Sequence, residues 1–99
     1  MYYALIGEDA PGALETRLAV RPEHLARLEA LRDAGRLLLA GPMPAIDSPD
    51  PGPAGFAGSL VVAEFDSLAS AEAWLAEDPY VREGVFARTR VHPFRKVLP

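Results

Sequence analysis

The order of strand-like and helix-like segments along this chain leaves few folds open. Four short apolar segments predict strands: Tyr2 to Gly7, Arg36 to Gly41, Ser59 to Phe65 and Val85 to Val97. Helical periodicity marks a short piece over Ala13 to Val20, then Pro22 to Ala34 and Leu68 to Glu77. The order strand, helix, strand, strand, helix, strand predicts an α+β, ferredoxin-like βαββαβ fold, an antiparallel sheet with two helices on one face.

Proline and glycine set the expected boundaries of these segments. Pro22 suits the first position of a helix, where its missing N–H leaves no hydrogen bond unmade, and Gly35 suits the end of the same helix. Asp78-Pro79 is expected to end the second helix, because a residue before proline avoids helical geometry. Pro93 indicates an edge position or a bulge in the last strand. The segment Pro44 to Gly58 is rich in proline and glycine and is expected to be a long loop.

Length and composition restrict the class of protein. A chain of 99 residues, 49% of them hydrophobic, suits a single domain over residues 1–99. A net charge of -4 with no basic cluster argues against nucleic-acid binding, and no apolar run reaches the length of a membrane span. The absence of cysteine removes disulfides and thiolate chemistry, and fits a reducing compartment. We therefore expect a soluble cytoplasmic protein that binds no membrane.

The sheet face away from the helices needs its own cover. Apolar residues alternate onto both faces of the second and third strands, so we expect the second strand to be largely buried on both sides. A second copy of the chain is the expected cover, which predicts a homodimer.

His24 is the first candidate for chemistry. It lies on the same helical face as Leu28 and Leu31, near the expected start of the first helix. In the predicted topology the start of the first helix lies near the end of the second, where Asp78 stands. A carboxylate beside an imidazole fixes its tautomer and raises its basicity, so the pair could move protons. The alternative is that His24 is a hydrogen-bonded core residue and that Asp78 only ends a helix.

Three neighbouring residues could complete a binding site. Arg21 precedes the expected helix start, where backbone amides also favour anions. Ser59 begins the third strand, and Tyr80 follows closely after Asp78. Each also has a purely structural interpretation, as a surface cation, a strand end or a core aromatic. Arg27 and Arg32 are expected on the solvated side of the helix, and His92 at a polar sheet position. The sequence shows no zinc-ligand spacing and no phosphate loop, so we expect no metal and no cofactor.

The chain resembles the YciI (YCII-related) family. The segments that carry the resemblance are Leu18-Ala19-Val20-Arg21-Pro22-Glu23-His24-Leu25, Gly35 to Pro42, Ala71-Glu72-Ala73-Trp74, Asp78-Pro79-Tyr80 and Val91 to Arg95. The resemblance implies a dimeric α+β barrel with a His–Asp pair in a cleft, which falls on His24 and Asp78. Asp33 is a competing partner, but it is half a helical turn out of phase with His24.

Two functions remain open. The resemblance to relatives that act on ring-cleavage or chlorinated hydroquinone intermediates implies a cofactor-independent lyase or isomerase acting on a small molecule. His24 would then be the general acid or base, Asp78 would orient it, and Arg21, Ser59 and Tyr80 would bind the substrate. The alternative is a non-catalytic domain that binds a small molecule or serves as an accessory module.

Overall fold

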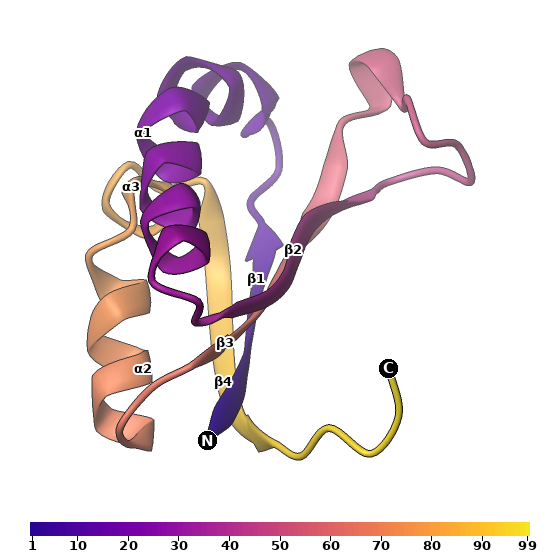
Figure 1. Ribbon diagram of the computed structural model, residues 1–99. Helices are drawn as coiled ribbons and strands as arrows, with labels where there is room; N and C mark the ends of the chain where they lie inside the picture. The colour runs from indigo at the N-terminus through magenta and orange to yellow at the C-terminus, as the bar shows by residue number, and fades with distance from the viewer.

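Four strands form one antiparallel sheet in the order β2-β3-β1-β4, and the computed structural model describes all residues from 1 to 99 (Figure 1). The elements are β1 (Tyr2–Asp9), α1 (Leu14–Asp33), β2 (Leu37–Pro44), the 3-10 turn η1 (Gly52–Ala54), β3 (Phe56–Glu64), α2 (Leu68–Ala76), α3 (Pro79–Arg82) and β4 (Phe86–Phe94). Figure 1 shows α1 and α2 on the same side of the sheet. The expected ferredoxin-like βαββαβ fold is confirmed.

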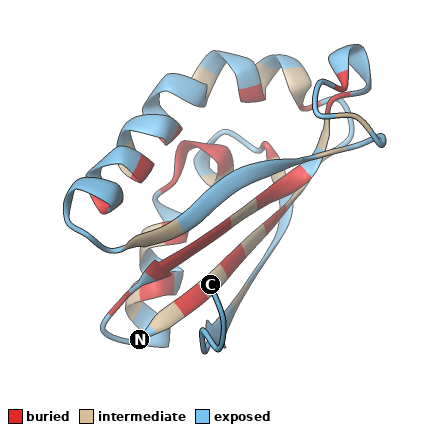
Figure 2. Ribbon diagram, turned by 45° about the vertical axis from the view of Figure 1, so that its right-hand side comes forward, coloured by how far each residue is buried: buried red, intermediate tan, exposed pale blue.

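The core lies between these helices and the sheet. Along β1, buried residues alternate with half-buried ones, so Tyr3, Leu5 and Gly7 face the helices (Figure 2). The hydrophobic cluster there takes residues from the sheet, from α1 and from α2: Tyr3, Leu5, Leu28, Leu31, Val61, Ala63, Phe65, Ala71 and Leu75. Two positions of the central strands have no room for a side chain. A Cβ on Gly58 would overlap the Gly7 carbonyl, and one on Gly7 would overlap the Phe86 ring.

The first helix is one continuous element, so two expected helical pieces are joined and Pro22 lies inside the helix rather than at its start. A proline here leaves the carbonyl of residue 18 without its helical partner. Leu18 is exposed, and the axis of α1 bends in Figures 1 and 2. Buried residues on both sides of the proline, Arg17 and His24 among them, hold the two parts together. Gly35 adopts a positive φ of 72° just after the helix, as expected for a helix end.

The second strand differs most from expectation. It was expected to be buried on both faces, yet its residues are half-buried or exposed. The reason is its edge position, since β2 pairs with β3 alone. Pairing also continues further than expected, to Pro44 opposite Phe56, so the long loop is shortened to residues 45–55 and contains η1. Figure 1 shows this end of the β2–β3 pair extending beyond the rest of the sheet.

The second helix begins as the sequence predicts. Ser67 accepts a hydrogen bond from the backbone N–H of Ser70, whose side chain bonds back to Ser67 in a capping box. The helix ends at Ala76, shortly before Asp78-Pro79, and Asp78 then caps the short helix α3. The expected edge position of Pro93 is also confirmed, because β4 pairs only with β1. None of the helices combines the length and apolar character needed to cross a membrane.

Candidate functional site

His24 and Asp78 are in direct contact. The imidazole Nδ1 lies 2.9 Å from each carboxylate oxygen of Asp78, although the two residues are 54 positions apart. His24 lies in the middle of α1, whereas Asp78 lies at the junction of α2 and α3. The predicted pairing is therefore correct, but its expected place at a helix start is not. Both side chains are almost completely buried.

The Asp78 carboxylate is fully surrounded by donors. Oδ1 accepts a hydrogen bond from the backbone N–H of Tyr80 at 2.9 Å, and Oδ2 accepts one from Arg27 Nη1 at 3.0 Å. Burial alone would raise the pKa of Asp78. The hydrogen bonds from His24 and Tyr80, with the positive charge of Arg27, outweigh burial and lower the pKa below 3.8. Asp78 is therefore a carboxylate at neutral pH, and His24 Nδ1 donates to it.

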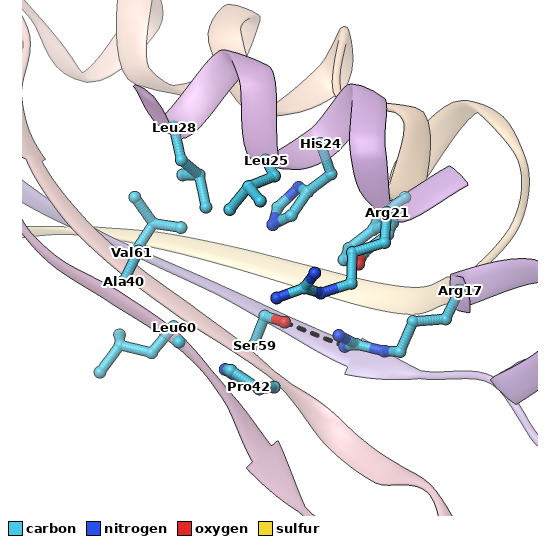
Figure 3. A pocket seen from close by; sticks show the side chains of 12 residues that line it. Arg17, Arg21, His24, Leu25, Leu28, Ala40, Pro42, Ser59, Leu60 and Val61 are labelled. Carbon is cyan, nitrogen blue, oxygen red and sulfur yellow. Dashed lines mark hydrogen bonds between the residues drawn. The ribbon is translucent and has the colours of Figure 1, made fainter. Parts of the chain in front are cut away.

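Tyr80 packs on one face of the His24 imidazole. The two rings stack with centroids 4.0 Å apart and planes 14° from parallel. Because Nδ1 is bound to Asp78, the other ring nitrogen, Nε2, is the one left for a ligand, and Figure 3 shows the His24 ring pointing from α1 into the cavity. Burial raises the pKa of the Tyr80 hydroxyl, against the opposing charges of Arg17 and Arg21. Tyr80 is thus a neutral phenol at working pH.

The cavity below His24 is small and mixed in character. It has a volume of about 120 Å³ and lies between α1 and strands β2 and β3 (Figure 3). Leu25, Leu28 and Val61 form its apolar wall, and Ser59 and Arg21 add polar groups. Arg21 extends toward Ser59 in Figure 3 and forms no salt bridge in the structure. The cavity therefore offers one uncompensated cation beside an apolar wall.

Arg17 is a site residue that the sequence did not reveal. Its guanidinium is buried and donates to both Asp9 oxygens at 2.8 Å and to Ser59 Oγ at 2.9 Å. It also lies over the ring of Tyr80, 4.7 Å from the centroid. The available signal was spacing: positions 17, 21 and 24 share one helical face, and all three line the cavity. Their side chains come together because α1 continues through Pro22.

Four other polar or charged positions can be compared with expectation. The helix-start amides expected beside Arg21 are absent, because α1 already begins at Leu14. Arg27 is not on the solvated side, since it binds Asp78. Asp33 is exposed and pairs with Arg32, so it does not compete for His24. His92 is exposed on β4, as expected for a polar sheet position.

The arrangement as a whole places a candidate base against a small, partly open cavity. A neutral imidazole with Nδ1 bound to a carboxylate presents an Nε2 lone pair to a ligand. Arg21 can hold an anionic group there. Arg17 donates to Ser59, so the Ser59 hydroxyl hydrogen remains free to bond an acceptor on the same ligand. No group of three or more side chains that could hold a metal ion occurs in the structure.

Comparisons with known proteins agree with this fold. The model of the YCII-related domain family matches residues 1–95. The chain is 59% identical over 98 residues to Protein YciI of Escherichia coli O6:H1, covering 99% of this chain and 100% of that one. It is 55% identical, with the same coverage, to an uncharacterized protein of Haemophilus influenzae.

A solved structure with a known activity is also similar. It is the 5-chloro-2-hydroxyhydroquinone dehydrochlorinase of Burkholderia phenoliruptrix, in complex with 2,5-dihydroxybenzoquinone. The TM-score is 0.83 at 26% sequence identity, with 96% of this chain and 94% of the other covered. The chain belongs to the YCII-related domain family.

Proposed function

We propose that the protein is a cofactor-independent lyase or isomerase in which His24 transfers a proton to and from a small anionic molecule. The observation that carries the proposal is the geometry of the imidazole. Nδ1 is bound to a carboxylate that has no exposure to solvent, and the opposite nitrogen is left for the cavity. An imidazole oriented in this way is a general base that works near neutral pH.

The cavity favours a small, ring-sized substrate. Its volume of about 120 Å³ and its wall of Leu25, Leu28 and Val61 suit a flat apolar body. Arg21 would bind an anionic oxygen of that body, and the Ser59 hydroxyl would donate to a second oxygen. Tyr80 contributes by stacking on His24 and by remaining a neutral donor.

The dehydrochlorinase relative supports this reaction class. Loss of HCl from a hydroxylated ring requires a base to remove a proton as the C–Cl bond breaks and chloride leaves. An isomerase of the same design would return the proton to another atom of the substrate. The shared requirement is one base with no metal or redox group, which His24 with Asp78 can supply.

A turnover assay with matched variants tests the proposal. Hydroxylated and chlorinated hydroquinones would be screened by ultraviolet absorbance and chloride release. We expect the native protein and His92→Ala, which changes the exposed histidine on β4, to turn over the same substrate. His24→Ala should lose about 10²–10⁴-fold in kcat, the usual contribution of proton transfer. Equal rates for His24→Ala and the native protein, both shown to be folded by circular dichroism, would exclude His24 as the base.

A non-catalytic binding domain is the second candidate. It is favoured by the dense network that fixes the site, because Arg17 links Asp9 to Ser59 through three hydrogen bonds. A thermal-shift screen with small carboxylates and phenolates distinguishes the two. Saturable binding that depends on Arg21, with every bound compound recovered unchanged, would favour this candidate over catalysis.

We also propose that two copies associate through the sheet face opposite the helices. Side chains of Ala4, Ile6 and Leu60 alternate onto that face and are only half-buried, and Leu39 is 48% exposed. Light scattering during size-exclusion chromatography should give a mass about twice 10.7 kDa. Ile6→Glu should reduce the mass to that of the monomer, whereas Glu29→Gln on the exposed side of α1 should not. A native monomer at all concentrations tested would refute the dimer.

A further inference from the structure

Arg27 shares the Asp78 carboxylate with His24. Its Nη1 donates to Oδ2 at 3.0 Å, and His24 Nδ1 lies 2.9 Å from the same oxygen. The two donors come from one face of α1, three positions apart. The carboxylate that orients the imidazole is therefore also the counter-ion of the Arg27 guanidinium.

The guanidinium is fixed from the side of α2. Nη2 donates to the Trp74 carbonyl at 2.8 Å, and the guanidinium carbon lies 4.1 Å from the centroid of the Trp74 ring. That carbonyl belongs to the last turn of α2, where the helix dipole favours a positive charge. One planar group thus meets a carboxylate, a carbonyl and an indole face together, which a lysine ammonium cannot reproduce.

The other groups around His24 are cationic or neutral. Arg21 lines the cavity without a salt-bridge partner, and Arg17 is compensated by Asp9. Tyr80 stacks on the ring as a neutral phenol. No carboxylate other than Asp78 contacts the imidazole. Asp78 is therefore the one carboxylate that can orient the imidazole, and its position decides which ring nitrogen faces the cavity.

We propose that Arg27 is a positioning residue: it holds Asp78 in place and thereby keeps the His24 proton on Nδ1 and the Nε2 lone pair directed into the cavity. This role rests on the proposed function of His24 as a base, because the base must present a lone pair to the substrate. Without Arg27, the Asp78 side chain keeps only the Tyr80 amide as a second donor, so it can turn away from the imidazole and leave the proton free to lie on either ring nitrogen. The substrate class follows: a molecule that gives up a proton in the first step.

Nitrogen-15 NMR of the ligand-free protein tests this inference directly. The His24 signals would be assigned by their loss in His24→Gln, and the state of both ring nitrogens followed against pH. In the native protein we expect the single proton of the uncharged ring on Nδ1. In Arg27→Gln both ring nitrogens should move toward the intermediate chemical shifts of mixed tautomers. Arg27→Lys keeps the charge but not the planar contacts and should restore the native signals only in part, and Arg32→Gln, an exposed arginine of the same helix, should change nothing.

Two results would overturn the inference. One is a native His24 whose uncharged ring carries its proton on Nε2, a result that needs no variant to fold. The other is a folded Arg27→Gln whose His24 keeps the native tautomer signals. Neither measurement uses a substrate, so both are independent of turnover. A native His24 with its proton on Nδ1 in a protein without activity would refute the proposed catalysis and leave the role of Arg27 intact.

Discussion

Replacing Arg17 with methionine should strongly destabilise the protein. Arg17 is 4% exposed, and the Asp9 side chain that accepts its two 2.8 Å hydrogen bonds is 6% exposed. Methionine retains much of the contact with the surrounding aromatic rings but cannot donate to Asp9. The substitution therefore leaves the buried Asp9 carboxylate without a partner, and an uncompensated buried charge strongly lowers the free energy of unfolding.

The expected loss is about 3 to 5 kcal/mol of unfolding free energy, the range found when one member of a buried pair is removed. A domain of this size has a total of only about 5–15 kcal/mol. Since about 1 kcal/mol shifts the midpoint of thermal unfolding by 4–8 °C in small domains, the decrease should be roughly 20 °C.

Urea denaturation followed by Trp74 fluorescence and circular dichroism measures this loss. The matched variant is Arg17→Met combined with Asp9→Asn, which removes the unpaired charge as well. It should be more stable than Arg17→Met alone, because the penalty arises from the stranded carboxylate rather than from the lost attraction. A single variant that loses less than about 1 kcal/mol, or a double variant that loses the sum of both single changes, would refute this reasoning.

Three further predictions concern stability. The pKa of Asp78 in the folded protein is below its ordinary 3.8, so on acidification the unfolded chain takes up a proton first. The stability present at neutral pH should therefore fall as the pH drops below about 4. Acid unfolding measured by circular dichroism should depend less on pH in Asp78→Asn. Ser67→Ala should cost about 1 kcal/mol in urea denaturation through loss of the α2 cap. Gly58→Ala, whose new methyl group meets the Gly7 carbonyl, should cost at least about 2 kcal/mol, whereas Gly41→Ala, with open space around it, should be tolerated.

The topology could be predicted because its signals are local. The short apolar runs of β1 and β3, the helical periodicity of Leu68 to Glu77 and the Asp78-Pro79 stop are all visible in short windows of sequence. Once that order of elements was fixed, the approach of His24 to Asp78 could be expected, although the helix that carries His24 begins well before it, at Leu14.

The buried arginines could not be predicted, because their burial depends on partners far along the chain. Arg27 meets Trp74 and Asp78 about 50 positions away, and nothing in its local sequence distinguishes it from the exposed Arg32. The continuity of α1 was hidden for a similar reason. Proline is a breaker by local rules, and only packing on both sides of Pro22 keeps the helix whole.

Asp78 takes part in local folding as well as in the candidate site. The oxygen that contacts His24 also caps α3 through the Tyr80 amide, so unwinding residues 79–82 and releasing the imidazole are one event. Hydrogen exchange at the Tyr80 amide should therefore report the fraction of molecules in which the pair is assembled. A ligand that binds only the assembled cavity would slow that exchange, which gives a route to finding ligands without an assay of turnover.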